Sequence, residues 1–161
     1  MVERILVGIG EHAISSDANS QLIASSLGSC LGIVIYDPIR KVAGMAHCLL
    51  PLSTSDPVKA KGNPMLYVDT GVPLLLNLFI ETGSRKKDLV LVVAGGANIN
   101  DKENVFEIGK KNYTVLRKIL WKNELLIKAE DVGSDKSRTM IVEVGAGSVS
   151  VRTETQVKKL L

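Results

Sequence analysis

The 161-residue chain is 45% hydrophobic and has only one Trp, three Tyr and two Phe, which indicates one domain, residues 1–161, with an aliphatic core. Its net charge of +3 is too small to indicate nucleic acid binding, and its basic clusters lack interleaved aromatic residues. No apolar run is long enough to span a membrane, no secretion signal is recognisable, and two cysteines make no disulfide framework, so we expect a cytoplasmic protein without membrane insertion.

The N-terminal third alternates β-rich and polar segments. A turn at "DPIRK" separates two apolar runs, which predicts a β-hairpin. The segments 11–20 and 53–64 are polar and rich in turn formers, and we expect 53–64 to be a long loop of the kind that covers a site. Strands are predicted at 4–9, 21–27, 30–36 and 42–49.

The remaining chain contains two helical patterns. Asn63 and Pro64 predict a helix start, Thr82-Gly83 predicts its end, and Pro73 should kink it or begin a second segment. Residues 109–124 carry an apolar stripe opposite Lys and Arg, which is typical of an amphipathic helix. Strands are predicted at 89–96, 125–133, 139–147 and 148–152, the first of them central and covered on both faces. The order favours an α/β fold with a mixed, largely antiparallel sheet or sandwich and at least two packed helices.

The first hairpin carries both cysteines and one of the two histidines. A turn centred between Pro38 and Ile39 places Cys30 directly opposite His47, with both side chains on one face. A thiol beside an imidazole is a candidate nucleophile with its base, and a neighbouring imidazolium favours the reactive thiolate. The same register places Cys48 on the other face, so a Cys30–Cys48 disulfide is not expected.

Small residues surround the candidate nucleophile. Gly28, Ser29 and Gly32 could let a substrate approach and leave the Cys30 N–H free for an oxyanion. The alternative is that Cys30 is an inert buried cysteine and His47 a hydrogen-bonded core residue. We expect neither a metal nor a cofactor, because adjacent His47 and Cys48 point apart and "AGGANIN" matches no nucleotide-binding motif.

Several blocks resemble, in order, those of the CheD family of chemoreceptor glutamine deamidases. They are "GIGEHAIS", "LGSCLGIVIYDPIRKVAGMAHCLLP", "YVDTGVPLLL", "AGGANI", "IGKKN" and "LLIKAEDVGSDKSRT". The resemblance implies an α/β sandwich similar to deamidating toxins. It also implies that Cys30 attacks glutamine side chains on the cytoplasmic helices of methyl-accepting chemotaxis receptors, that His47 is its base, and that a CheC-type phosphatase is a partner.

Two positions depart from the family pattern. Ala24 stands where the family usually has a threonine as third catalytic member, and Ser26 is its substitute if the segment keeps strand parity, whereas Ser25 would need a bulge. Ser134-Asp135 stand where glycine is common in the family. Three functions follow from the resemblance: a glutamine deamidase acting through a thioester, a catalytically weak module that binds chemoreceptors and a CheC-type phosphatase, and a receptor methylesterase using the same site.

Overall fold

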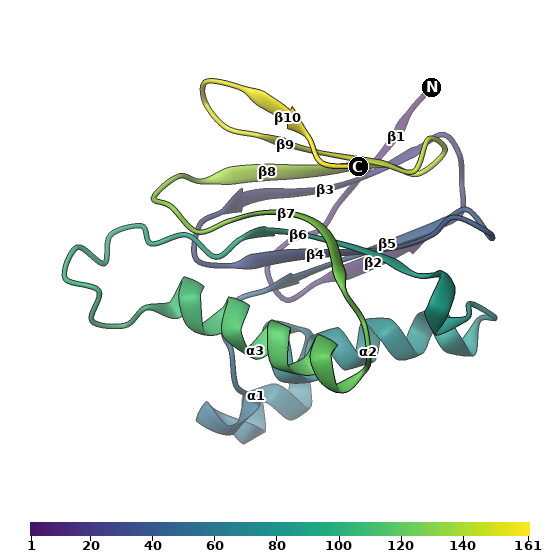
Figure 1. Cartoon of the computed structure of the whole chain (residues 1–161). Helices are drawn as coiled ribbons and strands as arrows, with labels where there is room; N and C mark the ends of the chain where they lie inside the picture. Colours follow the sequence, from purple (N-terminus) through teal and green to yellow (C-terminus); the bar gives the residue numbers. More distant parts are fainter.

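The computed structural model describes all 161 residues as three layers, which Figure 1 shows from the side. Two five-stranded sheets pack face to face, and helices cover the free face of one of them. The outer sheet has the order β1 (Glu3–Leu6), β3 (Ser20–Leu27), β8 (Arg138–Glu143), β9 (Ser148–Arg152), β10 (Val157–Lys159). The central sheet has the order β2 (His12–Ser15), β5 (Val42–Cys48), β4 (Leu31–Asp37), β6 (Val90–Gly95), β7 (Ile127–Val132).

The helical layer contains α1 (Pro57–Gly62), α2 (Val68–Glu81) and α3 (Ile108–Lys122). Three short 3-10 helices join the elements: η1 (Ser53–Ser55), η2 (Pro64–Leu66) and η3 (Lys86–Asp88). None of these helices combines the length and the apolar composition needed to cross a lipid bilayer. The expected α/β sandwich with at least two packed helices is confirmed.

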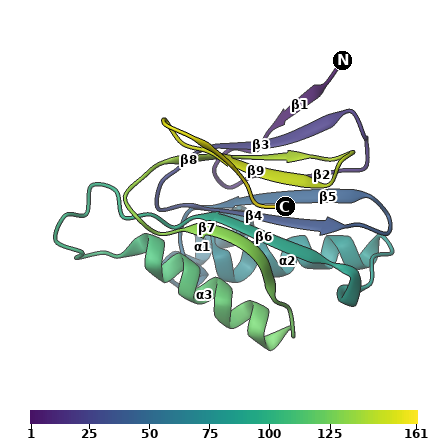
Figure 2. The ribbon, with the colours of Figure 1, turned by 45° about the horizontal axis from the view of Figure 1, so that its top comes forward.

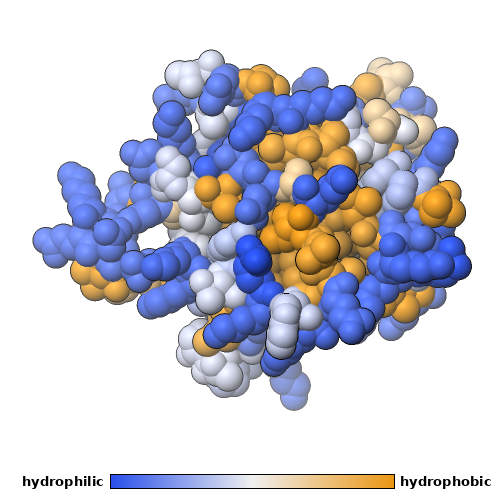
Figure 3. Space-filling model, in the orientation of Figure 1, coloured by the Kyte–Doolittle hydropathy of each residue, from blue (hydrophilic) through white to orange (hydrophobic).

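Two hydrophobic clusters form the core, one on each face of the central sheet. Every residue of β4 and β5 is buried, so alternate side chains enter different clusters. The first cluster lies against α2 and α3 and contains Cys48, whereas the second lies between the sheets and contains Cys30. Both cysteines are free thiols, and their expected placement on opposite faces is confirmed. Figure 3 shows a patch of apolar surface on the side of the molecule seen in Figure 1, near the C-terminal end.

The N-terminal segments differ in part from the sequence expectation. β1 ends at Leu6 instead of residue 9, because the Gly8 N–H donates to the Glu11 carboxylate and Gly10 turns the chain with φ +76°. The next residues, expected to be turn-rich, form β2, which pairs antiparallel with β5. Residues 157–159, for which no prediction was made, form β10 at the edge of the outer sheet.

The polar segment 53–64 is not a plain loop. It contains η1 and α1, and the Asp56 side chain caps α1 by accepting from the Lys59 N–H at 3.1 Å. Asn63 does cap a helix, but that helix is only the short η2. Tyr67 is extended because it forms a β-bridge with Leu50, and α2 begins at the next residue, Val68. Pro73 lies inside α2.

The β4–β5 hairpin has a turn shifted by one residue from the expected position. The last ladder pair is Asp37 with Val42, so the loop is 38–41. The Asp37 carboxylate accepts from the Ile39 and Arg40 N–H groups at 2.9 and 3.1 Å, and Lys41 closes the loop with φ +56°. The register therefore moves by two residues, and the expectation that Cys30 faces His47 directly is wrong: Gly32 does. An even shift keeps the parity, so Cys30 and His47 still share a face.

We expect Asp37→Ala to destabilise the hairpin by about 3 kcal/mol at pH 7, because the buried carboxylate also accepts from the Ser84 hydroxyl at 2.6 Å. Although burial opposes ionisation, the hydrogen bonds from Ser84, Arg40 and Ile39 lower the pKa of Asp37. Its stabilisation is therefore present above the unfolded-state pKa of about 3.9 and is lost as pH falls through the lower folded pKa.

Urea unfolding across pH tests this prediction. The matched control Ser84→Ala removes one of the three partners and should cost about 1 kcal/mol. A wild-type to Asp37→Ala difference that stayed constant down to pH 2 would contradict the ionic origin of the stabilisation.

Candidate active site

The candidate nucleophile lies just before β4, the middle strand of the central sheet. Cys30 ends a bend at 28–30, is 6% exposed, and belongs to the cluster between the two sheets. Its carbonyl accepts from the Gly96 N–H, and the Gly28 carbonyl accepts from the Ala97 N–H, both at 2.9 Å. The segment that follows β6 thus holds the backbone on both sides of the thiol.

His47 lies on the same face as Cys30, one step along the hairpin. It faces Gly32 on β4, which makes Cys30 its diagonal neighbour, at roughly 7 Å between backbone positions. His47 is 2% exposed, and its Nε2 atom has no hydrogen-bond partner. The two side chains therefore share the face between the sheets, and no direct hydrogen bond joins them.

The other imidazole nitrogen fixes the tautomer. His47 Nδ1 lies 3.0 Å from the Val7 carbonyl oxygen, just after β1. A carbonyl only accepts, so Nδ1 carries the proton and Nε2 holds a lone pair. Burial lowers the pKa of His47, against smaller opposing effects of the Val7 hydrogen bond and the Glu11 charge. The resting imidazole is neutral and can accept a proton at Nε2.

The cysteine is also neutral at rest. Burial raises the pKa of Cys30, and its own backbone N–H only partly offsets this. The expectation that an imidazolium favours the thiolate is wrong for this resting state, because burial of both groups disfavours charge on either. Cys48, in the other cluster, has its pKa raised to about 12, first by burial and then by Cys30.

Two consecutive backbone N–H groups beside the thiol have no acceptor in another residue. Neither the Ser29 nor the Cys30 N–H donates beyond its own residue, whereas the preceding Gly28 N–H donates to the Ser26 carbonyl at 3.0 Å. Free N–H groups next to a nucleophile are the donors that a developing oxyanion requires.

Glycine at position 95 permits the close approach of β6 to the nucleophile. Gly95 has φ +106°, and a Cβ there would lie 2.1 Å from the Cys30 carbonyl oxygen. Gly32 has a different role from the one expected: a Cβ there would meet Leu27 and Met140 side chains at 2.9 and 3.0 Å. The space above Gly32 is filled by the outer sheet and offers no path for a substrate.

The serine expected to replace the family threonine points the wrong way. A β-bulge between Ala24 and Leu27 breaks the alternation of β3, and Ser26 has φ +56°. Ser25 and Ser26 are both exposed, while Ala24 and Leu27 are fully buried. The premise that Ser26 keeps inward parity is therefore wrong, and the Val7 carbonyl is the group that contacts His47.

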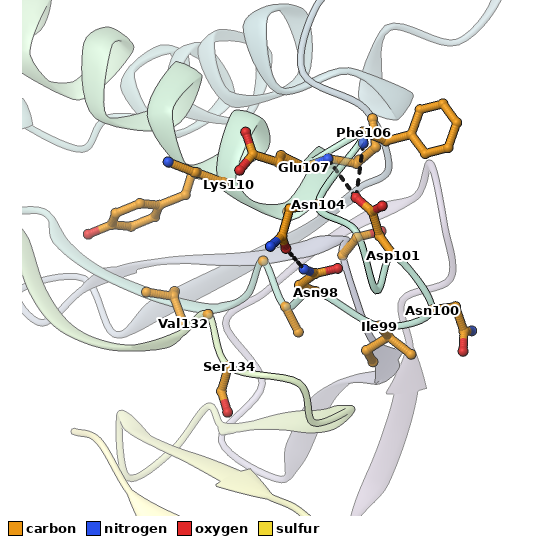
Figure 4. A pocket seen from close by; sticks show the side chains of 17 residues that line it. Asn98, Ile99, Asn100, Asp101, Asn104, Phe106, Glu107, Lys110, Val132 and Ser134 are labelled. Carbon is orange, nitrogen blue, oxygen red and sulfur yellow. Dashed lines mark hydrogen bonds between the residues drawn. The ribbon is translucent and has the colours of Figure 1, made fainter.

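A pocket of about 480 Å³ opens beside the nucleophile and is drawn in Figure 4. It lies between the long β6–α3 connection, which projects from the sandwich in Figure 2, the first turns of α3, and the end of β7. Ser29 and Gly96 line it, so it reaches the residue before Cys30 and the residue that holds the Cys30 carbonyl. Much of the remaining lining is polar: Asn98, Asn100, Asp101, Asn104, Glu107, Lys110, Tyr113 and Ser134.

Two groups at the site were missed by sequence reasoning. The Val7 carbonyl leaves no signal in a sequence, because any residue supplies a carbonyl. Asn112, fully buried on α3, donates through Nδ2 to the Ser29 carbonyl at 2.9 Å and the Leu49 carbonyl at 3.1 Å. Its signal was available: Asn112, Leu116 and Leu120 follow at four-residue spacing, so a polar residue interrupts the apolar stripe.

We expect the rate at which iodoacetamide modifies Cys30 to keep rising with pH beyond the ordinary thiol pKa of about 8.5, because burial raises the pKa of this thiol. Mass spectrometry of the alkylated peptide measures the rate. In folded Cys30→Ala, the buried Cys48 should stay unlabelled. A rate that levels off below pH 8 would contradict a neutral resting thiol.

Gly95→Ala should destabilise the protein by at least about 2 kcal/mol, because the added Cβ strains the backbone and collides with the Cys30 carbonyl. The matched control is Gly133→Ala, which has φ +81° and open space around the added Cβ, so it should show only a backbone effect of about 1 kcal/mol. Equal losses in urea unfolding would refute the contact with Cys30.

Comparison with known proteins places these features in a family. The family model described as "CheD chemotactic sensory transduction" matches residues 49–153. A relative from Solibacter usitatus, "Probable chemoreceptor glutamine deamidase CheD", is 39% identical over 99% of this chain and 95% of its own. A second, from Syntrophus aciditrophicus, "Probable chemoreceptor glutamine deamidase CheD 1", is 42% identical over 92% of this chain and 93% of its own.

Similarity among solved structures is weaker. Bacillus licheniformis hypothetical protein YfiH covers 77% of this chain and 49% of its own, with a TM-score of 0.47 and 14% identity. The match to Neisseria meningitidis protein NMB0706 covers 83% of this chain and 62% of that protein's chain, with a TM-score of 0.48 and 9% identity. The family model begins after Cys30 and His47, but the Solibacter relative spans nearly the whole chain. The chain belongs to the CheD family.

Proposed function

We propose that this protein hydrolyses glutamine side chains of chemoreceptors to glutamate, as the names of its relatives state for them. The single observation that supports this best is the unpartnered His47 Nε2, a neutral acceptor that shares a face with the Cys30 thiol. A receptor substrate implies that the protein acts in the cytoplasm. We further infer that residues 1–161 form one domain, because β3 from the N-terminal part of the chain pairs with β8 from the C-terminal part in the outer sheet.

The proposed reaction starts from a neutral Cys30 thiol and a neutral His47 imidazole. When the substrate amide reaches Cys30, His47 Nε2 takes the thiol proton as sulfur attacks the amide carbon. The free Cys30 and Ser29 N–H groups hold the resulting oxyanion. The C–N bond then breaks as the imidazolium gives its proton to the leaving –NH2 group, which departs as ammonia, and a thioester remains. Water, deprotonated by His47, hydrolyses the thioester and restores the thiol and the neutral imidazole.

The Val7 carbonyl takes the orienting role that the resemblance assigns to a threonine. Ala24 supplies no hydroxyl, but the bond to Val7 O already fixes which nitrogen is free. A third group mainly orients the base and stabilises its cation. The proposed reaction therefore proceeds without a hydroxyl at position 24.

The pocket beside Ser29 is the proposed docking place for receptor residues that neighbour the substrate glutamine. Its amide and carboxylate groups suit the polar side chains of an exposed helix. Ser29, the residue before Cys30, is part of its lining, so receptor residues bound there would bring the substrate amide close to the thiol. A CheC-type phosphatase remains a proposed partner on the family resemblance alone.

Mass spectrometry of receptor cytoplasmic fragments tests the activity. Wild-type protein should convert at least one glutamine to glutamate and release an equal amount of ammonia. Cys30→Ala should abolish both, and His47→Gln should lower the rate about 10²- to 10⁴-fold, because it removes the base. Unchanged turnover in Cys30→Ala would end the proposal.

One observation favours a second candidate, a weakly active binding module: burial raises the pKa of Cys30, so little thiolate is present at rest. In that case, wild-type protein would pull down receptor fragments or a CheC-type protein but leave the glutamines intact. A receptor methylesterase would instead release methanol from methylated fragments by the same steps.

A further inference from the structure

Asn112 makes an arrangement of hydrogen bonds that links the two halves of the candidate site. It is 0% exposed, and both of its Nδ2 hydrogen bonds go to backbone carbonyls, those of Ser29 and Leu49. Carbonyl oxygens only accept, so the amide nitrogen must face them. The orientation of the side chain is fixed by these two partners.

The two carbonyls lie where the hairpin strands part. Leu31 and Cys48 form the last pair of the β4–β5 ladder, and Ser29 and Leu49 lie just beyond it. Asn112 bridges the strands at this point, in place of a further ladder bond. Ser29 is the residue directly before Cys30, and Leu49 is two residues after His47.

The Ser29 carbonyl belongs to the same peptide unit as the Cys30 N–H. In a trans peptide these two groups point in opposite directions. By holding the carbonyl on the side of α3, Asn112 sets the direction of the Cys30 N–H, which points away from α3 and has no acceptor in another residue. A hydrogen bond to the carbonyl also polarises the amide and strengthens its N–H as a donor.

The hydrogen bonds of this residue serve the two backbone carbonyls and leave part of its own side chain unpaired. Asn112 Nδ2 satisfies the Ser29 and Leu49 carbonyls, whereas Asn112 Oδ1 is buried without a partner. Buried polar groups that break the apolar pattern occur preferentially where function requires them.

We propose that Asn112 is a positioning residue that aims the Cys30 N–H at the oxyanion of the reaction. The inference rests on the proposed glutamine hydrolysis and adds a residue of α3 to it. Asn112 touches neither substrate nor sulfur; it acts through the peptide between Ser29 and Cys30.

The test uses Asn112→Ala with Asn123→Ala as the matched control. Asn123 lies next to the C-terminus of the same helix and also donates through Nδ2 to a backbone carbonyl, that of Ile119, at 2.8 Å. Asn112→Ala should lower kcat on receptor fragments roughly 10- to 100-fold with KM unchanged, less than direct removal of an oxyanion donor. Asn123→Ala should leave kcat unchanged. Asn112→Leu, which fills the stripe, replaces Asn112→Ala should that variant not fold.

Alkylation by iodoacetamide separates positioning from general damage to the site. This reaction needs the thiolate but forms no oxyanion, so its rate per thiolate should match wild type in both variants. Its pH profile should shift upward in Asn112→Ala alone, because the Cys30 N–H helps to lower the thiol pKa. Wild-type kcat in Asn112→Ala and Asn112→Leu would overturn the inference, as would an equal loss of kcat and alkylation.

Hydrogen exchange keeps the inference separable from the proposed function. The amides of residues 28–31 should exchange faster in Asn112→Ala than in wild type or Asn123→Ala. If wild-type protein left every glutamine intact, the proposed function would be wrong. If amide exchange at residues 28–31 were also unchanged in Asn112→Ala, the positioning role of Asn112 would be wrong too.

Discussion

The site depends on the pairing of β4 with β5, two strands buried on both faces. Each residue of this ladder must enter either the cluster beneath the helices or the cluster between the sheets. A slip of one residue would exchange the two sets and move Cys30 away from His47. Because Leu31, Ile33 and Ile35 pack against α2 and α3, such a slip would also expose the helices to small and polar side chains. The aliphatic core therefore enforces the shared face of thiol and imidazole.

This constraint explains which parts of the site can be predicted from sequence. Parity survives any even shift of register, so the shared face of Cys30 and His47 follows from the apolar pattern alone. The exact pairing does not, because Asp37 selects a loop through hydrogen bonds to the Ile39 and Arg40 N–H groups. Sequence favours a turn at Asp37-Pro38 equally in both registers. Likewise, the bulge that turns Ser26 outward depends on how β3 meets β8 and leaves no local signal.

Secondary structure was predictable where one apolar period dominated. β6 and α3 show long, uniform patterns and were identified close to their observed bounds. β2 was missed because none of its four residues is buried, and they gain their structure by pairing with the edge of β5. The start of α2 was misplaced because Tyr67 has to bridge to Leu50, a tertiary requirement that overrides the cap and proline signals at Asn63 and Pro64.

Burial gives the pair a resting state with no net charge, and the backbone supplies what charge would otherwise provide. A thiol whose pKa is raised carries little thiolate and is therefore less prone to oxidation. The proposed reaction requires His47 to be aligned in advance, and the Val7 carbonyl holds its Nδ1 because the turn after β1, closed by Glu11 on the Gly8 N–H, brings the two together. Three elements remote in sequence, the end of β1, β5 and α3, thus converge on one short bend before β4. The only side-chain group that the bend contributes to the proposed site is the Cys30 sulfur. Its peptide groups contribute the Ser29 and Cys30 N–H groups and the Ser29 carbonyl that Asn112 holds.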